Sequence, residues 1–164
     1  MTVEIGVAFP DDVEAVAQNM RHRDFVEFSA LSPADGRTDL ANILVERYGR
    51  GTEVMVARWD GRPIAIGGLF CYRPNVASIL FLATDNFPRV ALSVTRFISK
   101  ELFPRYEEIG VHRFEAISML EHDEAHRWLA TLGLKKEAVF FDYGKNRETF
   151  VQFAKVVDAG PLGD

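Results

Sequence analysis

Apolar positions along this chain follow two periods, one typical of strands and one typical of helices. Alternating or continuous apolar runs predict strands at 3–9, 52–59, 62–72, 77–84, 111–119, 135–144 and 148–157. Apolar residues three and four positions apart predict helices at 11–28, 38–47, 88–102 and 122–132. The sequence therefore predicts one α/β domain with the order strand, two helices, three strands, helix, strand, helix and two strands.

Residues that favour turns and helix ends divide these segments. Asp60-Gly61 stands between two apolar runs and is a two-residue hairpin signal. Pro88 fits the first turn of the third predicted helix, and Pro104 is expected to close that helix. The continuous apolar run 77–84 predicts a central strand that is buried on both faces of its sheet.

The segment 122–134, HDEAHRWLATLGL, combines a clear helical pattern with a glycine stop. Its apolar residues share one helix face: Ala125, Trp128, Leu129 and Leu132. Gly133 stands where a residue in the left-handed conformation would end the helix. We therefore expect a short helix that runs straight into the following strand.

Composition and charge narrow the class of protein. With 164 residues, of which 48% are hydrophobic and 26% charged, the chain has the size and polarity of one globular domain. We expect that domain to cover 1–157 and residues 158–164 to form a flexible tail. The net charge of −5 argues against nucleic-acid binding. No apolar run reaches the roughly 20 residues of a membrane span, and no signal peptide is visible, so we expect a cytoplasmic protein.

The single cysteine excludes an internal disulfide. Cys71 lies in a strand-like run, where a small buried hydrophobe is expected rather than a nucleophile.

A strand, a short helix ending in Leu-Gly-Leu and a return strand resemble the C-terminal half of the GNAT superfamily of acyltransferases. The superfamily pattern there is Asn-x-x-Ala-x-x-(Phe/Leu)-Tyr-x-x-Leu-Gly-Phe, and Ala125, Trp128 and Gly133 take matching places. The order of elements matches over nearly the whole chain. The resemblance implies a mixed, mostly antiparallel sheet with helices on both faces, in which two central parallel strands, 77–84 and 111–119, splay apart.

The same resemblance implies acetyl-CoA as the acyl donor. Its pantetheine arm would enter the splay and pair with the backbone of the first strand, and its diphosphate would rest on amides at the start of the next helix. The implied cofactor-binding residues are Leu82, Ala83, Thr84, Arg89, Val90 and Ala91.

This loop departs from the superfamily pattern (Gln/Arg)-x-x-Gly-x-(Gly/Ala). If Arg89 takes the first place, Leu92 and Val94 stand where small residues are expected. Pro88 also removes one amide donor, and Asp85 adds a negative charge. These departures predict weak binding of acetyl-CoA. The basic residues of the following helix are either an anion-binding face or, as is more common, a solvated one.

N-acyl transfer needs a base for the amine and an acid for the leaving thiolate. In many GNAT enzymes the acid is the Tyr of the short helix, and Leu129 takes that place here. The catalytic candidates are therefore Asp85, Glu115 and His122. Glu115 is either a base or a member of an ion pair, and His122 either caps the short helix or contacts a ligand. The four histidines show no metal-ligand spacing, so no metal is expected.

Five short segments carry a narrower resemblance. They are Asn19-Met20-Arg21-x-x-Asp24-x-x-Glu27, Leu82-Ala83-Thr84, Arg96-x-x-Ser99-Lys100-Glu101, Ala125-x-Arg127-Trp128-Leu129 and Thr149-Phe150-Val151-Gln152-Phe153. They are similar to GNAT-like proteins of short-tailed bacteriophages, which include the small internal virion protein of type A. The resemblance implies a phage origin and a structural or host-directed role. The polar residues of the first segment are either a functional site or an ion-pair and capping cluster.

Two functions remain open from the sequence. One is an acetyl-CoA-dependent N-acetyltransferase with a degenerate cofactor loop, acting on a small-molecule or protein amine. The other is a non-catalytic, GNAT-derived protein, a pseudoenzyme that acts through protein partners in a phage virion or in the host cytoplasm. An exposed strand edge or aromatic patch is where either protein would self-associate.

Overall fold

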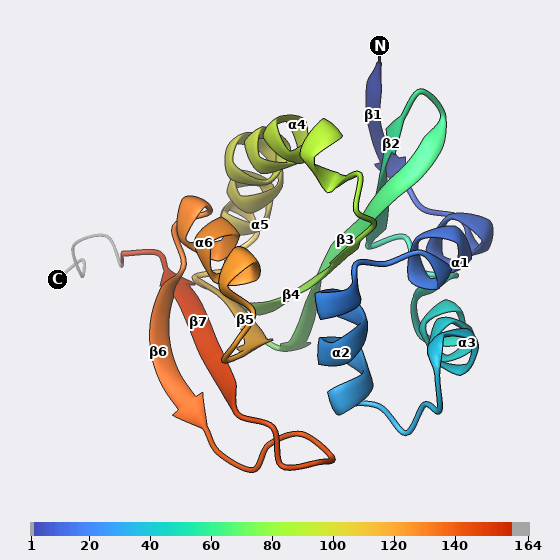
Figure 1. Cartoon of the computed structure of the whole chain (residues 1–164). Helices are drawn as coiled ribbons and strands as arrows, with labels where there is room; N and C mark the ends of the chain where they lie inside the picture. The colour runs from blue at the N-terminus through green and yellow to red at the C-terminus, as the bar shows by residue number, and fades with distance from the viewer. Residues whose placement is uncertain (1, 159–164) are drawn as a thin grey trace, which may run out of the picture.

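The computed structural model describes residues 2–158, and Figure 1 shows their arrangement. Strands of the described chain are β1 (Val3–Val7), β2 (Val54–Trp59), β3 (Arg62–Arg73), β4 (Val76–Ala83), β5 (Arg113–Met119), β6 (Lys135–Phe140) and β7 (Phe150–Val156). Its α-helices are α1 (Pro10–Gln18), α2 (His22–Ala30), α3 (Arg37–Tyr48), α4 (Ala91–Phe97), α5 (Phe103–Glu108) and α6 (Asp123–Thr131). A 3-10 turn, Phe87–Arg89, precedes α4, and a π-helical segment, Ile98–Leu102, joins α4 to α5. Of the predicted tail, residues 159–164 lie outside the described part.

The strands form a single sheet in the order β1-β2-β3-β4-β5-β7-β6. Its β4–β5 pair is parallel and its other pairs are antiparallel. The structure therefore confirms the mixed, mostly antiparallel sheet and its central parallel pair. The predicted hairpin joins β2 to β3, and both of its turn residues have positive φ, 48° at Asp60 and 78° at Gly61. This is the backbone that a type I′ turn requires, and Asp-Gly tolerates it.

Helices cover both faces of the sheet (Figure 1). Buried apolar residues of α1 and α3 pack on one face against β2, β3 and β4, with Phe25 and Phe28 of α2 at the margin. Residues of α4, α5 and α6 pack on the other face in two adjoining clusters. Buried apolar surface contributes about 25 cal/mol per Å² to stability, so these two layers are the main source of it.

The first predicted helix is wrong as a single element. The structure has two helices, α1 and α2, separated by a short extended break. Met20 forms an isolated antiparallel bridge with Thr84, and the backbone amide of Arg21 donates to the carbonyl of Ala83 at 2.8 Å. These long-range bonds hold residues 19–21 out of the helix, an effect that helical periodicity cannot reveal.

The prediction that Pro104 ends its helix is also wrong. The helix continues to Glu108, and Pro104 lies in the first turn of α5 directly after the π-helical segment. Proline cannot donate a backbone hydrogen bond and clashes with the preceding turn of a regular helix. A π-helical turn changes the hydrogen-bond spacing at this point, so the chain passes the proline without stopping.

The central parallel strands separate after three residue pairs. Val76, Ala77 and Ser78 of β4 are in register with residues 113–115 of β5, and the pairing ends there. Beyond Ser78 the two strands diverge, because β4 stays with β3 as far as Ala83 while β5 stays with β7 as far as Met119. The splay that the resemblance implied is therefore present, and it opens toward the carboxyl ends of both strands.

Cys71 is exposed, so the expectation of a buried cysteine is wrong. It lies near the end of β3, where the register with β4 shifts between Phe70 and Arg73 and the strand leaves the covered part of the sheet.

In the part of the chain that the structure describes, no helix has the length and apolar character needed to cross a membrane.

Candidate functional site

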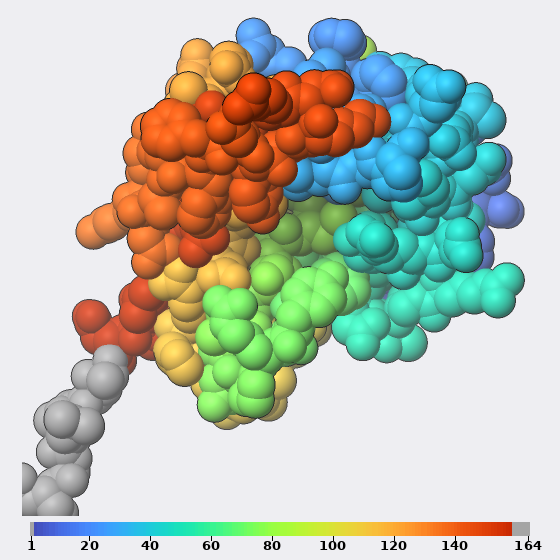
Figure 2. Space-filling view, turned by 90° about the horizontal axis from the view of Figure 1, so that it is seen from below, coloured from blue at the N-terminus to red at the C-terminus, as the bar shows by residue number. Residues whose placement is uncertain are grey.

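A cavity of about 230 Å³ occupies the splay between β4 and β5. Both strands contribute to its walls, with Ile79 and Phe81 from β4 and Ala116 and Ser118 from β5. The helices α2 and α6 and part of β3 complete the enclosure. Figure 2 shows the molecule from below, where green strand residues lie in a recess between the blue and teal N-terminal helices and the red β6–β7 region.

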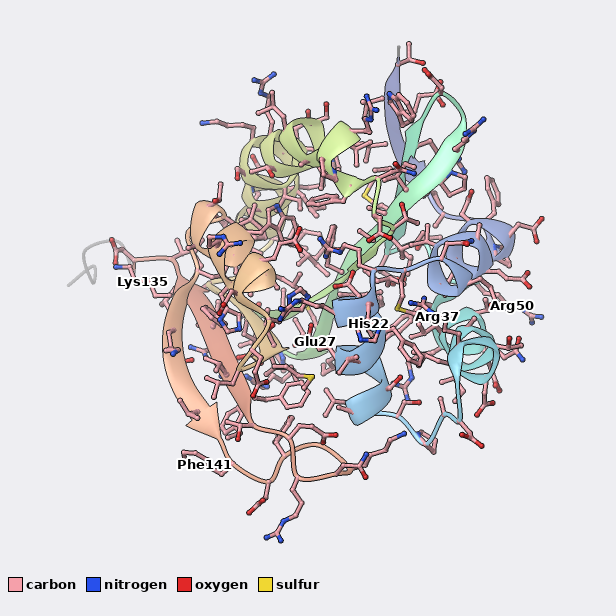
Figure 3. All side chains as sticks on the ribbon, viewed as in Figure 1. His22, Glu27, Arg37, Arg50, Lys135 and Phe141 are labelled. Carbon is pink, nitrogen blue, oxygen red and sulfur yellow. The ribbon has the colours of Figure 1, made fainter. Side chains whose placement is uncertain are left out.

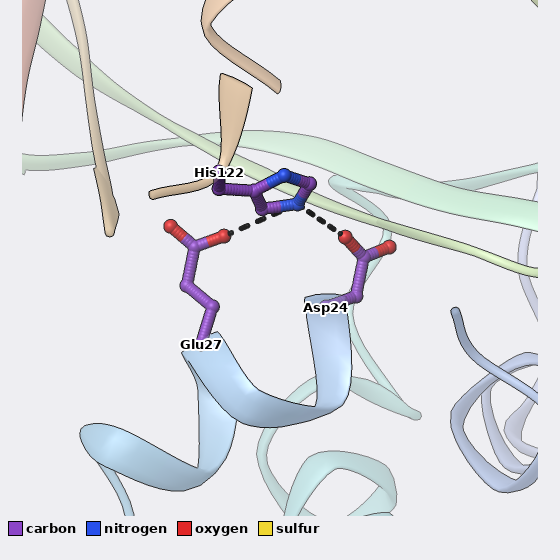
Figure 4. Close-up of side chains that lie close together, drawn as sticks. All are labelled: Asp24, Glu27 and His122. Carbon is purple, nitrogen blue, oxygen red and sulfur yellow. Dashed lines mark hydrogen bonds and ion pairs between the residues drawn. The ribbon is translucent and has the colours of Figure 1, made fainter. Parts of the chain in front are cut away.

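Three titratable side chains meet at the wall of this cavity: Asp24, Glu27 and His122. Asp24 and Glu27 are three positions apart on α2, so they share a face of that helix. His122 precedes α6, 98 residues from Asp24 in the chain, and its Nε2 lies 2.9 Å from Asp24 Oδ1. The same nitrogen lies 3.8 Å from Glu27 Oε2 (Figure 4). The sequence named His122 but could not supply its partners.

Hydrogen bonds fix the proton of the His122 ring. Its Nδ1 accepts from the backbone amide of Ala125 at 3.4 Å, so His122 is the N-cap of α6. In the neutral ring the proton is then on Nε2 and is donated to Asp24. His122 therefore caps α6, and both of its ring nitrogens have partners within the protein.

Asp24 is a buried carboxylate, 3% exposed, whose two oxygens are fully engaged. Arg21 donates to it twice, from Nε at 3.0 Å and from Nη2 at 3.1 Å. The backbone amide of Ala83 in β4 donates to the same carboxylate at 3.0 Å. Together with His122, these donors tie α2, β4 and the start of α6 into one network at the mouth of the splay.

Glu27 differs from Asp24 because no cation neutralises it. Across residues 2–158, no lysine or arginine makes an ion pair with Glu27. Its Oε1 accepts from the backbone amide of Met119 at 2.7 Å, and Oε2 faces the cavity. Figure 3 shows Glu27 on the side of α2 that faces β5. Burial raises the pKa of Glu27, and the nearby Ser118 hydroxyl, His122 ring and Met119 amide lower it by less.

Ser118 adds a second polar group without a partner. The residue is 2% exposed and lines the cavity beside Glu27. Its hydroxyl has no hydrogen bond of ordinary geometry among the described residues. Buried hydroxyls normally have partners, so a polar ligand atom in the cavity would satisfy this one.

The predicted cofactor residues of β4 lie at the splay, but their backbone is partly engaged. The amide of Ala83 donates to Asp24 and its carbonyl accepts from the Arg21 amide, so both of its splay-facing groups have internal partners. Leu82 is fully buried in the core, and the amide of Thr84 donates to the carbonyl of Ile64 in the other direction. At Ala83, the backbone groups of β4 that face the splay are therefore already hydrogen-bonded, to Arg21 before α2 and to Asp24 in α2.

The loop before α4 uses most of its own amides. Those of Phe87, Arg89 and Val90 donate within the 3-10 turn, and Pro88 has none. The loop itself therefore offers few free backbone donors to an anion.

The remaining predicted loop residues face elsewhere. The Arg89 guanidinium lies 4.8 Å from the centre of the Trp59 ring on β2. Val90 is completely buried in the core under α4. Asp85 is exposed in the turn after β4 and does not line the cavity. The structure therefore does not bring Asp85 together with His122.

Glu115 is a member of an ion-pair network. It accepts from Arg73 at 2.9 Å and from Arg113 at 2.8 Å, and Arg113 also bonds Glu137. Both carboxylate oxygens of Glu115 are used, at the point where the β4–β5 pairing ends. Of the two readings that the sequence left open, the structure bears out the ion pair.

Position 129, where many GNAT enzymes carry the catalytic tyrosine, is a buried leucine on the cavity wall. The neighbouring Trp128 fills part of the splay, with its ring 4.2 Å from that of Phe81. Its indole N–H donates to Thr95 Oγ1 at 3.0 Å, which links α6 to α4. At Trp128 and Leu129 the α6 wall is thus apolar, and the one charged α6 residue on the cavity, Glu124, pairs with Arg21 at 3.3 Å.

Asp24, Glu27 and His122 also offer one ligand atom each within 4.8 Å of one another, as a metal site would. A metal bound at His122 Nε2 would require the ring proton to be on Nδ1. Nδ1 accepts a backbone amide, however, so the metal would break the α6 cap. The hydrogen-bonded arrangement fits a proton-holding network better than a metal site.

The principal residue that the candidate catalytic list omitted is Glu27. Its signal was present in the pattern Arg21-x-x-Asp24-x-x-Glu27, which places three charged groups on one helix face. That pattern alone does not show that the face turns inward, because such a face is usually solvated.

Comparisons with known proteins identify the fold. No family model matches the chain, and no curated protein matches its sequence. Solved structures do match over almost the full length of both chains. A putative acetyltransferase from Salmonella typhimurium, solved with its cofactor acetyl-CoA, has a TM-score of 0.71 at 16% identity and covers 100% of this chain and 99% of its own.

Two further structures agree with that match. The ribosomal-protein-S18-alanine N-acetyltransferase of Escherichia coli has a TM-score of 0.68 at 16% identity, with 99% of each chain covered. A GNAT-family acetyltransferase from Bacillus anthracis has a TM-score of 0.64 at 15% identity, with 95% of each chain covered. The chain therefore has the GNAT acetyltransferase fold. Identities this low establish the fold and leave the activity to the site itself.

Proposed function

We propose that this protein is an acyl-CoA-dependent N-acyltransferase in which Glu27 is the general base. The observation that carries the proposal is the cavity in the β4–β5 splay, whose wall holds the largely buried Glu27 carboxylate, which pairs with no lysine or arginine in residues 2–158. A buried pocket with a few convergent polar groups and a perturbed carboxyl is the ordinary form of an active site. The fold shared with the acetyltransferases above supports the same reaction class.

The chemistry requires a neutral amine next to a thioester carbonyl. Acetyl-CoA, when bound, supplies the activated acyl group. In its ionised form Glu27 accepts a proton from the attacking amine, while the amine nitrogen forms the new C–N bond and the C–S bond to the thiol breaks. His122 and Asp24 act as positioning residues, because their hydrogen bonds hold α2 and the start of α6 at a fixed separation.

The loss of a tyrosine at position 129 weakens this reaction without excluding it. A thiol has a pKa near ~8.5, so a thiolate leaves more readily than an alkoxide or amide ion would. Protonation of the thiolate then follows from water or from a nearby hydroxyl. Ser118 is a buried hydroxyl in the cavity wall beside Glu27, and it can donate either to the Glu27 carboxylate or to the thiolate.

The two halves of acetyl-CoA fit this chain unequally. The acyl half fits, because the splay contains a cavity with an unpartnered hydroxyl. The diphosphate half fits less well, since the amides of Phe87, Arg89 and Val90 are used internally and Pro88 has none. We therefore propose, as the loop sequence also indicated, a degenerate cofactor loop and weak binding of the nucleotide part.

Thermal unfolding with two thioesters tests the proposal. Acetyl-CoA and S-acetylpantetheine, which lacks the nucleotide, should both raise Tm in a saturable way. A ligand at about 100 times its Kd adds about 2.7 kcal/mol, which is roughly 5–10 °C for a domain of this size. The two half-saturation concentrations should differ by less than tenfold, and release of free thiol with an added amine should accompany binding.

The variant Arg50→Ala is the matched control for this measurement. Arg50 is exposed after α3 and does not line the cavity, so the variant should bind acetyl-CoA as the parent does. If neither thioester changes Tm at millimolar concentration and no thiol is released, the enzyme proposal is wrong.

A second function is favoured by the closed edge of β4. Ala83 has its splay-facing groups satisfied by Asp24 and Arg21, as expected of a protein that no longer admits a pantetheine arm along the whole strand. On this alternative the chain is a non-catalytic, GNAT-derived protein that acts through protein partners. The phage resemblance of its short segments supports a place in a virion or in the cytoplasm of an infected host. The thermal experiment separates the two functions.

A further inference from the structure

The cavity continues from Glu27 to an aromatic and apolar mouth. The residues of this mouth come from α2, α3 and β3: Phe28, Leu31, Tyr48, Phe70 and Tyr72. The Phe70 ring lies 5.4 Å from that of Tyr48 and 6.2 Å from that of Tyr72, and the latter pair is nearly parallel at 18°. Tyr72 is 74% exposed and Leu31 45%, so the outer part of the mouth is open to solvent.

Charge at the inner end of the cavity is unbalanced. Arg21 compensates Asp24, but Glu27 has no cationic partner in residues 2–158. A buried carboxylate without a cation is costly unless a ligand supplies one. A protonated amine is the complementary group, and aromatic faces near its path attract cations as well.

Resting on the proposed function, we infer that the acceptor is a small primary amine carried by an aromatic or bulky apolar group. The ammonium group binds at Glu27 and Ser118, and the apolar body packs against Phe28, Tyr48 and Phe70. The mouth offers few polar side chains, so it disfavours acceptors with several hydroxyl or ammonium groups.

The size of the cavity agrees with this class of amine. A dry cavity of roughly 150 Å³ holds a benzene ring. The cavity here has about 230 Å³, so it exceeds the volume of one ring, and its inner part is shared by the amine and the acetyl group of the donor. A macromolecular acceptor would leave the inner part of this space unfilled unless its terminal residue were itself apolar.

Calorimetric titration of the full chain with three amines tests the inference without requiring turnover. The amines are 2-phenylethylamine, ethylamine and spermidine. We expect 2-phenylethylamine to bind at least tenfold more tightly than either of the others. Equal or tighter binding of ethylamine or spermidine would overturn the inference.

Three variants separate the contributions to amine binding. Glu27→Gln should weaken 2-phenylethylamine at least tenfold, and unchanged binding would contradict the ammonium site. Phe70→Leu, which keeps an apolar side chain, should weaken 2-phenylethylamine but leave ethylamine unaltered. Phe141→Ala is the matched aromatic control, since Phe141 follows β6 (Figure 3), is 77% exposed and does not line the cavity.

Thiol release and amine binding test the acyltransferase activity and the acceptor class separately. If thiol is released from acetyl-CoA faster with spermidine than with 2-phenylethylamine, the enzyme stands and the acceptor class is wrong. If 2-phenylethylamine binds in a Glu27-dependent way but no amine causes thiol release, the acceptor site stands and the acyltransferase is wrong.

Discussion

Replacing Glu27 with glutamine should lower kcat/KM for N-acylation by about two to four orders of magnitude, the usual contribution of a general base. Glutamine keeps the shape of the side chain and can still accept the Met119 amide, so the cavity should persist. It cannot take the proton of the attacking amine. The measurement is the initial rate of thiol release, with acetyl-CoA binding followed separately.

The pH dependence of the rate gives a second test of Glu27 as the base. Burial raises the pKa of Glu27, so protonation of the native base begins at a higher pH than for an ordinary glutamate. Activity of the parent protein should therefore fall as the pH is lowered through this raised pKa. The residual activity of Glu27→Gln should lack that limb of the profile.

The pH dependence of the free energy of unfolding gives an independent check on Glu27, because proton binding is linked to folding. A carboxyl whose pKa is higher in the native state binds more protons there than in the unfolded state. The free energy of unfolding of the parent protein thus decreases as the pH rises from the unfolded-state pKa of Glu27 to its native-state pKa. Relative to the parent, Glu27→Gln should be more stable at pH 7 than at pH 4.

The control is Glu46→Gln on the exposed face of α3. It changes the same functional group and should leave the rate within experimental error. If Glu27→Gln and this control have equal kcat/KM, Glu27 is not the base.

Replacing Asp24 with asparagine should lower the free energy of unfolding by about 3–5 kcal/mol, the cost of breaking a buried ion pair. Each Asp24 oxygen faces donors only: Arg21 and His122 on one side, Arg21 and the Ala83 amide on the other. The amide nitrogen of asparagine would have to face one of these pairs. Urea unfolding at pH 7 measures the effect.

Asp142→Asn is the matched control for this change. Asp142 also pairs with an arginine, but the side chains of Arg147 and Asp142 are 82% and 61% exposed. Exposed ion pairs contribute about 1 kcal/mol or less. A loss for Asp24→Asn no larger than that for Asp142→Asn would show that the network at the splay is not a structural anchor.

Local patterns in the sequence were sufficient for most of the architecture. Asp60-Gly61 predicted the β2–β3 hairpin, and the continuous run 77–84 predicted the central strand. The Leu-Gly-Leu ending of the short helix predicted α6, whose stop at Gly133 has the expected positive φ of 90°. Each of these features depends on residues within a few positions of one another.

Features that depend on distant partners were missed. The break between α1 and α2 is held by bonds from Met20 and Arg21 to the end of β4. The helix passes Pro104 because a π-helical turn precedes it. Such effects are decided by tertiary packing, which overrides local propensity.

The candidate site shows the same division. His122 could be named because it begins a recognisable helix, and its capping role is a local one. Glu27 was visible only as part of a charged helix face. Its place at the cavity depends on a long-range contact. The fold brings His122 to within 2.9 Å of Asp24, 98 residues away in the chain, and this contact turns the Glu27 face of α2 toward the splay.

A crystal structure of the protein grown with acetyl-CoA and 2-phenylethylamine would locate both substrates. We expect the pantetheine arm to lie between β4 and β5 and the amine nitrogen to contact the Glu27 carboxylate. A thioester bound on any other surface, or an amine placed away from Glu27, would show that Glu27 is not the base of an acyltransferase site.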